Sequence, residues 1–142
     1  TYHHLKYLIW SVVVGVTLSV TSCLSGDAGE DFIATGAGLF ITNEGNFQYG
    51  NATLSYYDPA TKQVQNEIFF RANGMKLGDV AQSMTIYDNK GWVVVNNSHV
   101  IFAIDLNTFK EVGRIENLTS PRYIHFLSAE KAYVTLMWDY GI

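Results

Sequence analysis

Short strands alternate with compact turns from residue 38 onward, and this pattern repeats about every forty residues. The runs are rich in β-branched and aromatic residues, which favour strands. The strand at residues 92–97 is echoed at 132–136, so that Trp92 and Ala132 are 40 positions apart. Four short antiparallel strands per repeat of this length are typical of a β-propeller blade. A β-sandwich or a small barrel is the alternative that this pattern leaves open.

Two matched turns support the repeat. Asp58 and Asp105 each end an expected strand, open a turn, and are followed three residues later by Thr61 and Thr108. An aspartate at such a position accepts hydrogen bonds from backbone amides of its own turn. We therefore expect both carboxylates to stabilise turns locally.

We predict an all-β fold, a β-propeller of four-stranded antiparallel blades, of which this chain holds an N-terminal fragment. A closed ring needs roughly four to eight blades. We place about two and a half blades at residues 38–70, 81–115 and 122–142, the first without its innermost strand and the third truncated. Residues 65–70 are the expected third strand of the first blade.

The first 22 residues have the pattern of a secretory signal. They contain no Asp or Glu, and Lys6 precedes an apolar stretch over residues 8–20. A membrane-spanning helix needs about 20 apolar residues, so this stretch is too short to be one. A basic start followed by a short apolar segment indicates a cleaved signal peptide.

The only cysteine, Cys23, ends this segment. Val20 lies three positions before it and the small Ser22 directly before it, which resembles a bacterial lipobox and implies cleavage and lipidation at Cys23. A buried structural cysteine is the alternative. Residues 23–37 are small, flexible and acidic, as expected for a tether. Acidic residues after a lipidated cysteine also resemble a surface-export signal, which favours the cell surface over the periplasm.

Charge and motifs restrict the function. The net charge of −4 makes nucleic acid a poor partner. The sequence has no nucleophile elbow, no zinc-protease motif and no phosphate-binding loop. His99 and His125 fall in different blades, so no metal cluster is expected. We expect a non-catalytic protein. The alternatives are a propeller enzyme, such as a lactonase or a quinoprotein-type dehydrogenase, and a scaffold for protein partners.

The two ends of the blades differ in their connections. Because successive turns of a meander fall on alternate ends, the connections can be sorted without a structure. The loop end collects residues 43–51, 74–82, 96–98, 117–123 and 138–140. The turn end collects residues 58–62, 88–91, 106–110 and 128–131. Long loops with aromatic and amide side chains on a rigid scaffold are where binding usually occurs.

We therefore expect the ligand at the loop end. The candidate contacts there are Glu44, Asn46, Phe47, Tyr49, Asp79, Gln82, Asn97, Arg122, Tyr123 and Trp138. Structural roles remain open for several of them. Asp79 could order a loop, Asn97 could satisfy turn backbone, and Arg122 could pair with Glu44 or Asp79.

Six segments carry a family resemblance over about residues 38–137. They are residues 43–46, 51–58, 72–74, 77–84, 94–98 and 118–124. Together they resemble the YncE-like, DUF5074-type surface-layer propeller lipoproteins of Bacteroidetes, a group that includes cobalamin-binding surface propellers.

The resemblance implies a seven-bladed propeller that binds a ligand at one end of its channel. It further implies an outer-membrane lipoprotein, exposed at the cell surface, that captures a cobalamin-like molecule or a glycan for a partner transporter. No cofactor is expected, and cobalamin enters only as a possible ligand.

Overall fold

The computed structural model describes residues 37–138. The chain divides into two units at residue 31, and all the described residues belong to the second, residues 32–142. The predicted signal peptide at 1–22, the lipidation site Cys23 and the tether up to residue 36 therefore lie outside the described residues.

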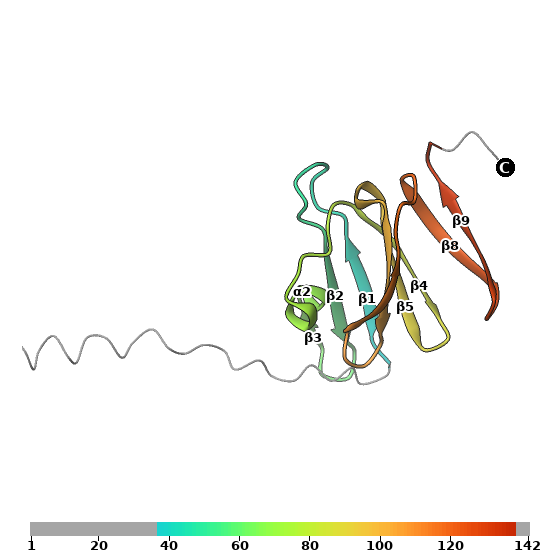
Figure 1. Cartoon of the computed structure of the whole chain (residues 1–142). Coiled ribbons are helices and arrows are strands. Elements are labelled where there is room, and N and C mark those ends of the chain that lie inside the picture. The colour runs from blue at the N-terminus through green and yellow to red at the C-terminus, as the bar shows by residue number, and fades with distance from the viewer. Residues whose placement is uncertain (1–36, 139–142) are drawn as a thin grey trace, which may run out of the picture. The chain divides into compact units, whose positions relative to one another are not determined.

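The second unit contains three antiparallel sheets in chain order, seen side by side in Figure 1. The first sheet comprises β1 (Leu39–Asn43), β2 (Thr53–Asp58) and β3 (Gln63–Gln65), followed by α2 (Ile68–Asn73). The second comprises β4 (Ala81–Tyr87), β5 (Lys90–Val95), β6 (Val100–Asp105) and β7 (Glu111–Ile115), with the 3₁₀ turn η1 (Asn96–Ser98) between β5 and β6. The third comprises β8 (Pro121–Ser128) and β9 (Lys131–Leu136).

Strand order within each sheet follows the sequence, so every sheet is a simple meander. This confirms the all-β prediction and the blades of a partial β-propeller. The described residues form no closed barrel.

Two separate apolar cores hold the sheets together. The first lies between the first and second sheets and includes Leu54, Tyr56, Phe102 and Phe109, all buried. The second lies between the second and third sheets and includes Val94, Ile101 and Ile124. The two central strands β5 and β6 thus bury alternate side chains on opposite faces, as expected for a blade covered on both sides.

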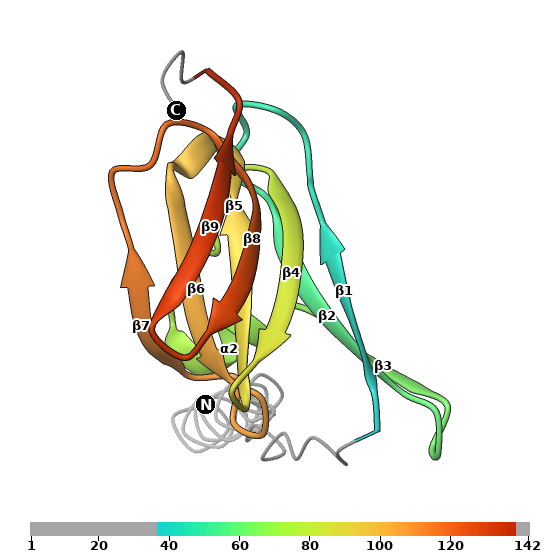
Figure 2. The same cartoon turned by 90° about the vertical axis from the view of Figure 1, so that its right-hand side faces the viewer.

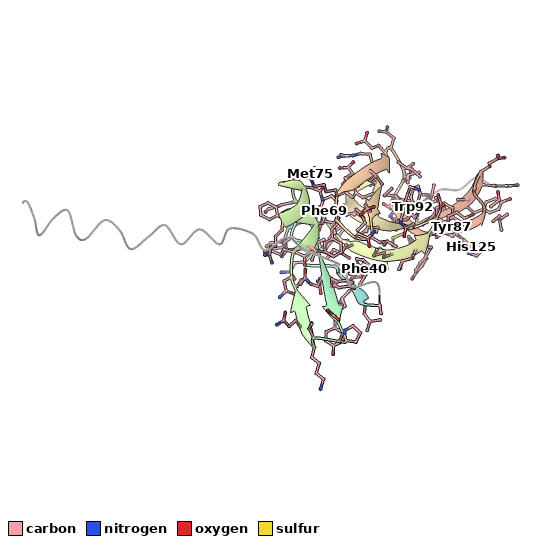
Figure 3. The ribbon with its side chains drawn as sticks, turned by 90° about the horizontal axis from the view of Figure 1, so that it is seen from below. Phe40, Phe69, Met75, Tyr87, Trp92 and His125 are labelled. Carbon is pink, nitrogen blue, oxygen red and sulfur yellow. The ribbon has the colours of Figure 1, made fainter. Side chains whose placement is uncertain are left out.

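Aromatic pairs cross both interfaces. The rings of Phe69 and Phe102 lie 4.9 Å apart on one face of the second sheet. On the other face, Phe126 stacks on Tyr87 at 4.3 Å and contacts Trp92 at 5.0 Å. Figure 3 labels Phe69, Tyr87 and Trp92 among the side chains. Such pairs contribute about 0.5–1.5 kcal/mol beyond their buried area.

The expected strand at residues 65–70 is wrong. β3 ends at Gln65, and the short helix α2 begins at Ile68. Ile68 and Phe69 are adjacent and both buried, which a strand with one buried face does not permit. Glu67 and Gly74, at the two ends of α2, adopt left-handed conformations with φ of 55° and 69°.

The repeat interval of 40 residues between Trp92 and Ala132 is one residue too short for the second strand of the third blade. Trp92 pairs with Thr85 in β4–β5, and Tyr133 pairs with His125 in β8–β9. The structural equivalent of Trp92 is therefore Tyr133, not Ala132. A register shift between residues 126 and 128 of β8 accommodates the additional residue.

The two aspartate turns form as predicted. Oδ1 of Asp58 accepts a hydrogen bond of 2.8 Å from the Ala60 amide. Oδ1 of Asp105 accepts bonds from the amides of Asn107 and Thr108, at 3.0 and 2.8 Å. The backbone and side-chain hydrogen bonds from Thr108 lower the pKa of Asp105, because they stabilise its carboxylate.

Candidate ligand-binding surface at the loop end

The loops of the predicted loop end do gather at one end of the sheets. Figures 1 and 2 show the β1–β2 loop, the start of β4, η1 and the β7–β8 link at the top, opposite the hairpin turns. A backbone hydrogen bond of 3.0 Å from the Ala52 amide to the Gly78 carbonyl connects the first two of these segments.

Asp79 is buried at the centre of the loop end, with 7% of its surface exposed. Its Oδ2 accepts hydrogen bonds from the Gln48 amide at 2.7 Å and from Asn97 Nδ2 at 2.5 Å. Its own amide donates to Ser98 Oγ at 2.9 Å. Asp79 therefore orders the β1–β2 loop and η1. This is the structural role that the sequence left open for it. Asn97 likewise has its side chain engaged within the fold.

The β1–β2 loop holds two aromatic side chains out into solvent. Phe47 is 61% exposed and Tyr49 is 75% exposed. Gln48 between them has φ of 70°, an uncommon conformation for a residue with a side chain. Asn51 Oδ1 accepts from the Asn46 amide at 2.8 Å, and the Tyr49 amide donates to the Asn46 carbonyl at 3.0 Å. Asn46 thus shapes the loop through its backbone.

The neighbouring residue Asn96 joins the second and third blades. It is buried, its Nδ2 donates to the Pro121 carbonyl at 2.9 Å, and its amide donates to the Val80 carbonyl at 2.8 Å. His99 Nδ1 accepts from the Ser120 amide at 3.2 Å. These bonds fix the start of β8 beside η1.

Gln82 and Arg122 occupy equivalent bulges. The pairing of β4 with β5 skips Gln82, and the pairing of β8 with β9 skips Arg122. The two strands lie next to each other, since Ser83 Oγ donates to the Arg122 carbonyl at 2.6 Å. The structure thus brings these two candidates together from different blades.

Arg122 does not pair with Glu44 or Asp79. No carboxylate of the described residues lies within 4.0 Å of its guanidinium group, and its Nη1 contacts Met137 Sδ at 3.7 Å. Tyr123 and Trp138 are 54% and 60% exposed. An ion pair with Glu44 or Asp79, one of the structural roles left open for Arg122, is therefore not formed among the described residues.

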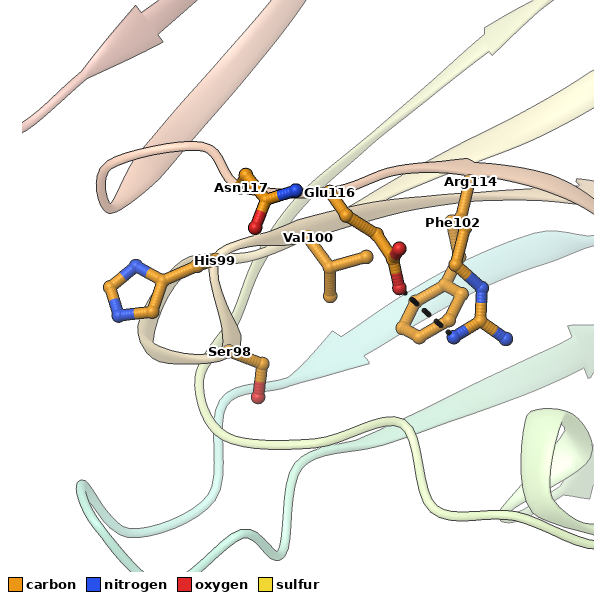
Figure 4. Close-up of a pocket in the computed structure, with 7 residues that line it drawn as sticks. All are labelled: Ser98, His99, Val100, Phe102, Arg114, Glu116 and Asn117. Atoms are coloured by element: carbon orange, nitrogen blue, oxygen red, sulfur yellow. Dashed lines mark ion pairs between the residues drawn. The ribbon is translucent and has the colours of Figure 1, made fainter.

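Sequence reasoning missed a hollow of about 350 Å³ near the start of β6, shown in Figure 4. Its lining residues are Ser98, His99, Val100, Phe102, Arg114, Glu116 and Asn117. Arg114 donates to both oxygens of Glu111 at 2.5 and 2.6 Å, lies 3.6 Å from Glu116, and sits over the Phe102 ring. The hydrogen bonds that Arg114 donates to Glu111 raise the pKa of its guanidinium group. The hollow depends on the pairing of β6 with β7, so no local motif marks it.

Two further findings concern only residues 37–138. No three His, Cys, Asp or Glu side chains in this range are close enough together to hold a metal ion. No helix in the same range has the length and apolar character needed to cross a membrane.

Comparison with protein families identifies a matching model. The family model described as "Domain of unknown function (DUF5074)" matches residues 37–142. No curated protein matches the chain. The matched range includes all the described strands and every candidate contact residue.

Proposed function

The chain belongs to the DUF5074 family, and we propose that it is a non-catalytic propeller that captures a ligand at the loop end. The observation that carries this proposal is the pair of exposed aromatic residues, Phe47 and Tyr49, on a loop that buried Asp79 fixes by a hydrogen bond to Gln48. Large exposed aromatic side chains in a fixed loop indicate a surface that binds something flat or apolar on one side.

A loop that is already fixed loses less conformational entropy when a ligand binds. Immobilising a flexible side chain or loop on binding costs about 0.5–1.5 kcal/mol for each rotamer-rich side chain. The hydrogen bonds from Gln48 and Asn97 to Asp79 already restrain the backbone around the aromatic rings. Tyr49 in particular combines a large contact area with few rotatable bonds.

The ligand that fits this surface is large and polar, with many hydrogen-bonding groups. Glu44, in the same loop as Phe47 and Tyr49, offers a carboxylate, and Gln82 at the bulge of β4 offers an amide. A cobalamin-like molecule, with its amide side chains, and a glycan, with hydroxyl groups around flat apolar faces, both have this character. We propose ligands of these two kinds.

The proposal includes the cellular setting. The signal at residues 1–22, the lipobox-like sequence before Cys23 and the acidic tether support a lipoprotein anchored in the outer membrane and exposed at the cell surface. A protein that holds a ligand there without converting it would deliver it to a transporter, which we propose as the partner. We also assign the chain to the YncE-like surface lipoproteins of Bacteroidetes on the segments described above.

Titration calorimetry tests the binding function. The whole protein is titrated with cyanocobalamin and with a panel of glycans, as wild type and as Tyr49→Ala. We expect affinity for at least one compound and about a tenfold loss in the variant, equivalent to about 1.4 kcal/mol. Lys62→Ala, an exposed change at the turn end, is the matched control and should bind as wild type.

Absence of binding to every compound, together with measurable lactone hydrolysis, would overturn the proposal in favour of an enzyme. The anchor is tested separately by incorporation of labelled fatty acid in cells. Labelling should occur in the wild type and disappear in Cys23→Ser. Removal of the protein from intact cells by added protease should show exposure at the surface.

A further inference from the structure

Two successive blades carry the same irregularity at the same place. β4 begins with buried Ala81 and then bulges at Gln82, and β8 begins with buried Pro121 and then bulges at Arg122. A bulge leaves one residue without a pairing partner and interrupts the ladder of hydrogen bonds, so its repetition indicates a requirement. Bulges commonly redirect a side chain beside a binding or catalytic site. The residue presented at this place is polar in both blades.

The two bulged residues are held close to each other. Ser83 Oγ donates to the Arg122 carbonyl at 2.6 Å, and Thr85 Oγ1 donates to the Ile124 carbonyl at 3.1 Å. These side-chain to backbone bonds join β4 and β8, which belong to different sheets. Gln82 and Arg122 therefore stand at the same level of two neighbouring strands, at the loop end.

Arg114 in β7 and Arg122 at the loop end differ in whether a carboxylate balances their charge. Arg114 is neutralised by two hydrogen bonds to Glu111 and by Glu116 at 3.6 Å. Arg122 is half-buried, and its described surroundings supply the Met137 sulfur at 3.7 Å and no carboxylate within 4.0 Å. A partly desolvated guanidinium group without a counter-ion attracts an anion more strongly than one in water.

Guanidinium groups bind carboxylates and phosphates through paired, parallel hydrogen bonds. A primary amide such as that of Gln82 adds a neutral donor without repelling an anion. We infer that Gln82 and Arg122 together bind an acidic group of the captured ligand. This inference rests on the proposed function and specifies the class of ligand. The acidic group could be the phosphodiester of a cobalamin or the carboxylate of an acidic glycan.

Matched pairs of compounds separate the acidic group from the rest of the ligand. Cyanocobalamin is compared with cobinamide, which has the same corrin ring but lacks the nucleotide, and loss of the difference in Arg122→Gln assigns it to the phosphodiester of that nucleotide. Polygalacturonate is compared with its methyl ester, which has the same sugar chain without the charge. The whole protein is titrated with all four as wild type, Arg122→Gln, Gln82→Ala and the control Lys62→Gln, which removes an exposed charge at the turn end.

We expect the wild type to prefer the acidic member of one pair by tenfold or more, and the pair that shows it identifies the source of the acidic group. Arg122→Gln should abolish the preference, Gln82→Ala should reduce it, and Lys62→Gln should leave it unchanged. Thermal melts check folding. If Arg122→Gln unfolds, Arg122→Lys, which keeps the charge and loses the paired bonds, should still reduce the preference.

Binding by the wild type without a preference for the acidic member in either pair would overturn the inference while the proposed function stands. A preference that survives Arg122→Gln in a folded protein would overturn it as well. If the wild type binds none of these compounds and no glycan of the wider panel, the proposed function fails and the inference fails with it.

Discussion

The loop end and the turn end of these blades are held in different ways. At the turn end, Asp58 and Asp105 accept hydrogen bonds from amides two or three residues away, so these aspartates close each turn with groups of its own. At the loop end, Asp79 accepts from Gln48, 31 residues earlier, and from Asn97, 18 residues later. Local bonds close turns, whereas long-range bonds hold loops that have little structure of their own.

This difference explains where function is expected. A turn satisfied by its own residues leaves few groups for a ligand, and its sequence is accounted for by folding. At the loop end, the buried carboxylate of Asp79 fixes the β1–β2 loop. The exposed aromatic side chains of this loop, Phe47 and Tyr49, belong to neither apolar core of the described residues. Exposed aromatic residues on an ordered loop are better explained by binding than by stability.

The largest expected effect on stability lies at the turn end. Phe109, in the β6–β7 turn, is fully buried and packs against Phe40 and Tyr56 with ring centroids 5.9 and 5.5 Å away. Phe109→Ala should lower the free energy of unfolding by about 3–5 kcal/mol, measured by urea denaturation. The affinity of the remaining folded protein should not change. A specific loss of affinity would show that the two ends are not independent.

Asp79→Ala should have the next largest effect. It leaves the Gln48 amide and the Asn97 side chain without their acceptor, at a cost of about 3 kcal/mol for hydrogen bonds to a charged group. Hydrogen exchange at the Gln48 amide should also accelerate, whereas amides of the turn end should be unaffected. Unchanged exchange at Gln48 would contradict the role assigned to Asp79.

The sequence predicts elements that depend on residues close in sequence better than elements that depend on distant residues. β6 (Val100–Asp105) and β7 (Glu111–Ile115) lie where the pattern placed them, and the aspartate turns formed as expected, because both depend on residues close in sequence. The helix α2 was missed because Ile68 and Phe69 are buried in a core formed by residues distant in sequence, where Phe69 packs against Phe102. The bonds of Asp79 and the hollow beside Arg114 depend on tertiary pairing that no local motif encodes.

Asp105 should contribute a smaller, pH-dependent share of stability. Hydrogen bonds from Thr108 lower its pKa below the usual value of 3.8. Its contribution is therefore complete above pH 3.8 and is lost as the pH falls through the lower pKa of the folded state. Asp105→Ala should cost about 1 kcal/mol at neutral pH. The difference from wild type, followed by denaturation at a series of pH values, should shrink in acid; a constant difference would contradict this account.

The smallest effect on stability is expected at the exposed aromatic residues. Phe47→Ala and Tyr49→Ala should each change the free energy of unfolding by no more than about 0.5 kcal/mol, as for other exposed positions. Thermal melts of the two variants measure this. A large loss of stability would mean that these rings support the fold and would contradict their assignment to ligand binding.

Hydrogen–deuterium exchange of the whole protein tests the central claim most directly. Exchange is compared with and without saturating cyanocobalamin, and with and without each glycan that binds in the calorimetric panel. The account predicts slower exchange in residues 43–51 and 74–82 at the loop end and no change in residues 58–62 and 106–110 at the turn end. Protection confined to the turn end, or absent from the loop end under saturation, would contradict it.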